Sequence, residues 1–154
     1  MKSVIEEYIK NVDNVTDVVI TSQEIGEDNK SLMTKLVFKF GEVKIQSSIF
    51  ENTAISILGF IMNFHYTIQQ KITRQALLEM VNDFNKKAPG AKASLKNIEG
   101  KKIIIDFRIE TFFSESSDMK NIIAATLPMF ILSPVMLSKT LENKGYKHNS
   151  IMED

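Results

Sequence analysis

The chain has 154 residues, of which 44% are hydrophobic and 25% charged, and it contains neither cysteine nor tryptophan. This composition is typical of one globular domain and excludes a disulfide scaffold, a collagen-like repeat and a disordered polar chain. The formal net charge is zero. A neutral total argues against a dedicated nucleic-acid binder, although residues 1–30 are acidic and residues 71–108 are basic.

The spacing of apolar side chains and of turn residues predicts the secondary structure of the chain. In chain order we expect a helix in residues 1–12, strands in 18–25, 32–40, 43–50 and 54–68, a helix in 73–88, a hairpin in 91–109 and a helix in 118–143. Thr73 and Ser117 are the expected N-caps of the last two helices. Pro128 and Pro134 are expected to kink or interrupt the last helix, because each removes a backbone hydrogen bond.

This order of elements predicts an α+β fold in which an antiparallel sheet packs against two or three helices. Segment 54–68 fits both a helix and a strand, and its alternation and aromatic content favour the strand. No linker or repeat divides the chain, so we expect a single domain of residues 1–145 and a flexible polar tail of residues 146–154. Acidic residues interrupt the first apolar stretch. The sequence therefore predicts no signal peptide and a cytoplasmic location.

The residues that most often carry catalysis are scattered. His148 lies in the polar tail, and His65 lies on the outward side of its predicted strand, where a solvated or hydrogen-bonded histidine is expected. Asp106 and Glu110 alternate with basic residues on one strand, which indicates a salt-bridged solvent face instead of a shielded acid–base pair. The chain has no phosphate-binding, nucleophile-elbow or zinc-protease motif. We therefore predict no enzyme, no catalytic residue, no metal site and no cofactor.

A candidate basic face lies on the predicted 91–109 hairpin. Alternation places its basic side chains on the outward side, where they could neutralise a phosphate backbone. Aromatic side chains do not alternate with them, so bases would have no stacking platform. A solvated sheet face is favoured over an acidic protein partner, and nucleic-acid binding comes last. The residues of this face are Lys92, Lys96, Lys102 and Arg108.

The last predicted helix is apolar on almost every side. One sheet can cover only one face of a helix, so the rest must contact another helix, a second subunit or a client protein. Burial within the chain and contact in a homodimer remain as alternatives. The most apolar stretch, residues 122–137, is shorter than a membrane span, so none is expected. The candidate interaction surface consists of Ile123, Leu127, Phe130, Ile131 and Met136.

The segment Leu77–Lys86 reads LLEMVNDFNK and precedes the predicted 91–109 hairpin. Together with the order of elements, it resembles the type III secretion chaperone-like superfamily, which includes the YbjN-like bacterial proteins. The resemblance covers most of residues 1–143 in outline. It implies a homodimeric α+β module that binds proteins and has no catalytic residues, in which Asn82 and Asn85 cap or bridge to the following turn.

Three functions remain open from the sequence. The leading hypothesis is a non-catalytic, chaperone-like module that binds proteins through its apolar helix and sheet surfaces, as a homodimer. The alternative is an enzyme or a carrier of a small apolar ligand, with a pocket between the sheet and the C-terminal helix. The third is weak nucleic-acid binding by the 91–109 hairpin.

Overall fold

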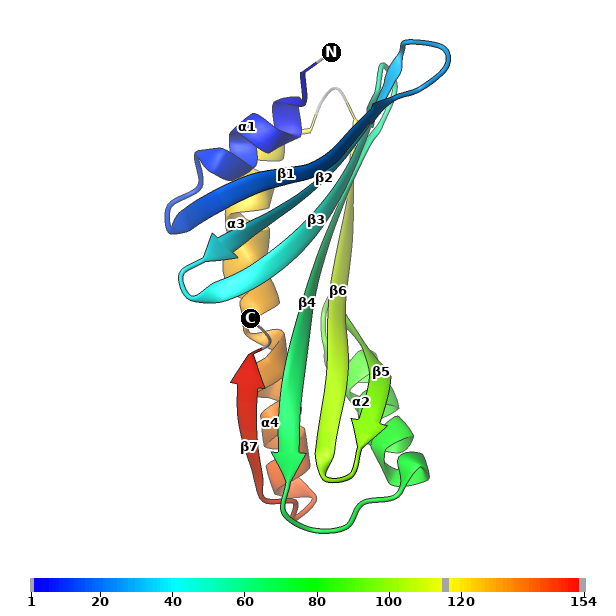
Figure 1. The fold of residues 1–154 in the computed structure, drawn as a ribbon, viewed down its shortest axis with the longest axis vertical. Helices are drawn as coiled ribbons and strands as arrows, with labels where there is room; N and C mark the ends of the chain where they lie inside the picture. The colour runs from blue at the N-terminus through cyan, green and yellow to red at the C-terminus, as the bar shows by residue number, and fades with distance from the viewer. Residues whose placement is uncertain (1, 115–116, 153–154) are drawn as a thin grey trace. The chain divides into compact units, whose positions relative to one another are not determined.

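The computed structural model describes residues 2–114 and 117–152 and has the predicted α+β fold with an antiparallel sheet (Figure 1). The strand order is β1-β2-β3-β4-β6-β5, and β7 pairs with β4. The elements are α1 (Val4–Lys10), β1 (Val15–Ile25), β2 (Ser31–Phe40), β3 (Val43–Asn52), β4 (Ser56–Ile68), α2 (Arg74–Lys87), β5 (Lys92–Glu99), β6 (Lys102–Phe113), α3 (Met119–Ile131), α4 (Ser133–Asn143) and β7 (His148–Met152).

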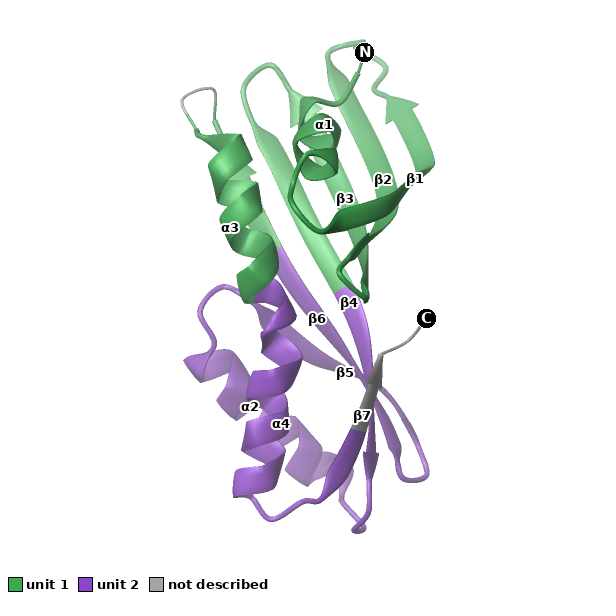
Figure 2. Ribbon diagram, turned by 90° about the vertical axis from the view of Figure 1, so that its left-hand side faces the viewer, with its two compact units in different colours: residues 1–61, 110–129 green, residues 62–109, 130–154 purple. Residues whose placement is uncertain are grey.

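The contacts within the chain divide it into two compact units (Figure 2). Unit 1 consists of residues 1–61 and 110–129, and unit 2 of residues 62–109 and 130–154. Strands β4 and β6 contribute residues to both units. No composition shift accompanies this division, so the sequence carries no signal for it.

Unit 1 is built on the β2–β3 hairpin. Phe40 pairs with Val43 across the turn, and Gly41 within the turn has φ +60°, which glycine adopts without strain. The strict alternation along β2 buries one of its faces, as the sequence predicts. Helix α1 is capped by Ser3, packs against these strands (Figure 2) and buries Ile5 and Ile9. The buried side chains of β2 are Leu32, Thr34, Leu36, Phe38 and Phe40.

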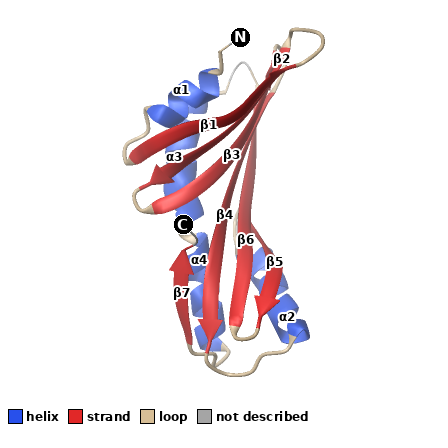
Figure 3. Ribbon diagram, viewed as in Figure 1, coloured by secondary structure: helices blue, strands red, loops and turns tan. Residues whose placement is uncertain are grey.

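Unit 2 pairs strands in the order β7-β4-β6-β5, with α2 and α4 as its helices (Figure 3). Its core contains Phe107, whose ring meets those of Phe64 and Phe84 edge-on at centroid distances of 6.4 and 5.7 Å. Edge-to-face pairs of this kind stabilise a core beyond the area that they bury. Thr73 caps α2 as predicted, its hydroxyl accepting the N–H of Ala76 at 3.1 Å.

A side chain joins α2 to the sheet of unit 2. Asn85 Oδ1 accepts the N–H of Ala93 at 2.7 Å, and Asn85 Nδ2 donates to the Ala93 carbonyl at 2.9 Å. The side-chain amide of Asn85 thus bonds both backbone groups of Ala93, as the backbone of a neighbouring strand would. Asn82 is exposed, so only Asn85 makes this bridge.

The helix expected in residues 118–143 is interrupted at Leu132, beside Pro134, as its prolines predict, whereas Pro128 lies inside α3. Pro134 stands in the first turn of α4, where its missing N–H costs nothing. Two other details of the last third of the chain differ from the prediction. Asp118, in place of Ser117, accepts the first free N–H of α3, from Asn121 at 3.3 Å. Residues 148–152, expected in a flexible tail, form β7 against β4. Segment 54–68 contains a strand, as favoured.

Candidate functional site

Unit 1 contains a cavity of about 270 Å³. Val4 of α1, Ile55 of the β3–β4 turn, Phe113 at the end of β6 and Met119 of α3 give it apolar walls, and Glu51 of β3 adds a carboxylate. The volume lies just below the range of about 300–1,000 Å³ that is typical of small-molecule sites. A cavity and a buried acid thus coincide in unit 1.

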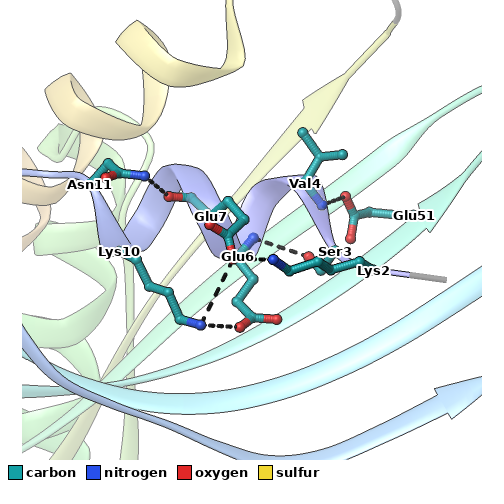
Figure 4. A network of polar contacts seen from close by, with 8 residues as sticks. All are labelled: Lys2, Ser3, Val4, Glu6, Glu7, Lys10, Asn11 and Glu51. Atoms are coloured by element: carbon teal, nitrogen blue, oxygen red, sulfur yellow. Dashed lines mark hydrogen bonds and ion pairs between the residues drawn. The ribbon is translucent and has the colours of Figure 1, made fainter.

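Glu51 holds the start of α1. The N–H group of Val4 donates to its Oε1 at 3.0 Å (Figure 4), and the N–H group of Ile5 donates to the same oxygen at 3.2 Å. The side chain lies on the buried face of β3 with Ile45, Ser47 and Ile49, and only 7% of the residue is exposed. Its second oxygen, Oε2, is buried and accepts no hydrogen bond from the described residues. One oxygen therefore has a structural role, and the other is left unsatisfied.

The other acids of this region are paired with lysines. Lys2 lies 3.0 Å from Glu7, and Lys10 pairs with Glu6 (Figure 4). The hydrogen bond from Lys2 lowers the pKa of Glu7, and the hydrogen bond to Glu6 raises the pKa of Lys10. No ion pair to Glu51 is found in residues 2–114 and 117–152. The cavity thus borders the one carboxylate of Figure 4 that has no cation.

The second candidate is the exposed side of residues 119–143. Of the residues predicted as an interaction surface, Ile123, Leu127 and Phe130 are 0% exposed and belong to the core, Ile131 is half-buried, and Met136 is exposed. In a helix that is apolar on almost every side, the sequence does not indicate which side faces the core. The sequence analysis therefore chose several residues from the buried side. We call five of the exposed apolar residues of this segment the apolar seam; they are Ile122, Ala125 and Met129 on α3 of unit 1, and Leu132 and Met136 in unit 2.

By length and composition alone, Met119–Asn143 could cross a membrane, with a mean hydropathy of 1.7 in its most apolar window. The sequence analysis expects no span because it considers only residues 122–137. Core helices of soluble proteins meet the same criterion. Here only 33% of the most apolar window is buried within the chain.

The predicted basic face is divided among local partners. Lys96 and Arg108 lie 3.9 and 3.6 Å from opposite oxygens of Asp106, and Lys92 donates to the Asn85 carbonyl at 2.8 Å. Lys102 stands opposite Glu99 in the backbone register of the hairpin. Half of these charges are thus directed at an acid of the same sheet, which favours the solvated face that the sequence analysis ranks first.

The two histidines lie in different surroundings. His148 packs edge-on against Tyr66 at 5.6 Å, with Nε2 3.6 Å from Glu142, and His65 is half-buried on β4. No group of three metal-ligating side chains is found in the described residues. Between the sheet of unit 2 and its helices, the space beside Tyr66 and Leu141 measures only about 10 Å³. That is room for about one water molecule.

Glu51 was missed by the sequence analysis. Its partners in α1 lie 46 and 47 residues earlier in the chain, and an acid on a strand normally faces solvent. One signal was present: Glu51 has the same parity as Ile45 and Ile49, so strict alternation predicts that it points inward.

Comparisons of the chain with protein-family models, with curated proteins and with solved structures find no match.

Proposed function

We propose that the protein is a non-catalytic protein-binding module, and that its apolar seam pairs with the seam of a second copy of the chain. The observation that carries this proposal is the exposure of Met129 (58%) and Leu132 (54%) on a segment of which only a third is buried. Leaving such side chains in water forgoes about 1.5–3 kcal/mol each relative to full burial.

The spacing of the seam supports a helix as the occupant. On α3, Ile122, Ala125 and Met129 follow each other at intervals of three and four residues, the repeat that packs one helix against another. Two of the five are methionines, whose flexible side chains adapt to an irregular partner. A second copy supplies the same repeat, and a two-fold contact needs only one self-complementary surface.

Size-exclusion chromatography with light scattering tests the proposal. We expect a dimer for the wild type and a monomer for Met129→Glu combined with Met136→Glu, because a carboxylate buried in an apolar contact is costly. Ala124→Glu is the matched control: Ala124 is exposed on the same helix but lies outside the seam, so this variant should remain a dimer.

A wild type that is monomeric at every concentration contradicts the proposal. Co-sedimentation with lipid vesicles that is lost in the double variant would assign the seam to a membrane surface instead of a second chain. Helical circular dichroism of the double variant checks that it is folded.

A further inference from the structure

The unsatisfied oxygen of Glu51 points to a ligand for the cavity of unit 1. A buried carboxylate oxygen without a donor is costly, because the charge has lost its water and gained nothing in exchange. Glu51 Oε1 is stabilised by two backbone N–H groups, while Oε2 has none in the described chain. The side chain lines a cavity of about 270 Å³, so a change in the orientation of the carboxylate would bring Oε2 within reach of a donor there.

The charges around the cavity favour a cation. Glu6 and Glu7 are already neutralised by Lys10 and Lys2, whereas the partners of Glu51 within residues 2–114 and 117–152 are the backbone N–H groups of α1. Lys2 also lines the cavity, but its ammonium is 3.0 Å from Glu7 and its side chain is 77% exposed. A ligand cation would therefore meet one uncompensated acid and one lysine that is already paired.

The single free oxygen selects the kind of cation. A guanidinium binds a carboxylate best through two parallel hydrogen bonds, which need both oxygens. An ammonium is a compact charge with three donors, so it can use Oε2 alone. The hydroxyls of Thr53 and Ser56 also line the cavity and can accept its remaining N–H groups.

We propose that this cavity binds a primary ammonium carried on a small apolar body, with the ammonium donating to Glu51 Oε2 and the apolar body lying against Val4, Ile55 and Phe113. Because Oε2 is closed off from solvent in the structure, binding requires a small rotation about the terminal bond of Glu51, a torsion with a broad minimum. The remaining wall, Met119, is flexible enough to follow the ligand.

Titration of the ¹⁵N-labelled protein with three probes tests the proposal. n-Butylammonium is expected to shift the amide signals of Val4 and Ile5, which donate to Glu51. Butylguanidinium and the uncharged 1-butanol should each bind at least about tenfold more weakly, since a hydrogen bond to a charged group contributes about 1.5–3 kcal/mol. Equal affinity for n-butylammonium and 1-butanol, or no binding of n-butylammonium, overturns the proposal.

Two variants test the charge of Glu51 and the free space of the cavity independently. Glu51→Gln removes the charge and should weaken n-butylammonium at least about tenfold. Ala54→Leu keeps Glu51 and fills the cavity from a lining position, so it should abolish binding even if Glu51→Gln loosens α1. Glu79→Gln, at an exposed acid of α2, is the matched control and should bind like the wild type. Unchanged affinity in Ala54→Leu, or in a folded Glu51→Gln, contradicts the assignment.

Discussion

Tyr66 shows how one buried polar atom constrains unit 2. Its side chain is 0% exposed, and its hydroxyl donates to the Pro134 carbonyl at 2.9 Å, which also accepts from Ser138 at 2.9 Å. Pro134 stands at the start of α4. The tyrosine therefore ties β4 to the first turn of α4 by a hydrogen bond that spans 68 residues of chain.

The same burial makes the stability sensitive to alkaline pH. Burial raises the pKa of Tyr66, because the phenolate would lose its hydration, and the neighbouring Ser138 hydroxyl opposes this in part. The unfolded state ionises near pH 10 while the folded state keeps its proton, so stability is full below about pH 10 and falls as the pH rises above it.

Urea unfolding at a series of pH values checks this expectation. Tyr66→Phe should cost about 1 kcal/mol at neutral pH for the lost hydrogen bond, and its stability should fall less steeply than that of the wild type above about pH 10. Tyr146→Phe, at a half-buried position, is the matched control and should keep the wild-type slope. Equal slopes for Tyr66→Phe and the wild type would refute the role of Tyr66.

At the scale of elements, α2 is held to β5 by Asn85 as well as by its apolar side. The two hydrogen bonds to Ala93 satisfy both backbone groups of one residue at the edge of the sheet, since β5 ends the strand order. We expect Asn85→Ala to lower the free energy of unfolding by about 1–3 kcal/mol, because it leaves these groups without partners.

Asn82→Ala is the internal comparison for that measurement. Asn82 lies on the same helix but is exposed, so its replacement should change the free energy of unfolding by no more than about 0.5 kcal/mol. Chemical denaturation of the two variants measures both values. Similar losses would mean that helix propensity, not the bridge to Ala93, sets the effect.

The elements themselves could be predicted because their signals are local. Alternation identified β2 and β3, and the hydroxyl of Thr73 marked the start of α2. The side of the last helix that faces inward could not be predicted, because Ile122 and Ile123 look alike in sequence and differ only in what packs on them. β7 was missed for a related reason: its partner on β4 is more than eighty residues away, and its polar residues show no periodicity.

At the scale of the whole molecule, the exposed apolar seam and the buried residue Leu127 are expected to stabilise the protein in different ways. Leu127 is 0% exposed and stabilises the chain itself, whereas Met129 is 58% exposed and can stabilise only an association. A residue that acts through association contributes in proportion to the logarithm of protein concentration. The two roles are therefore separable by dilution.

We expect the melting temperature of the wild type to rise with protein concentration, because the proposed dimer forms only from folded chains. In Met129→Glu combined with Met136→Glu it should be independent of concentration and equal to the value that the wild type approaches on dilution. Leu127→Ala should instead lower the melting temperature at every concentration, by the equivalent of about 2–5 kcal/mol, and keep its concentration dependence. Differential scanning calorimetry over a wide concentration range measures all three. A melting temperature of the wild type that does not change on dilution would mean that the seam has no partner in a second copy.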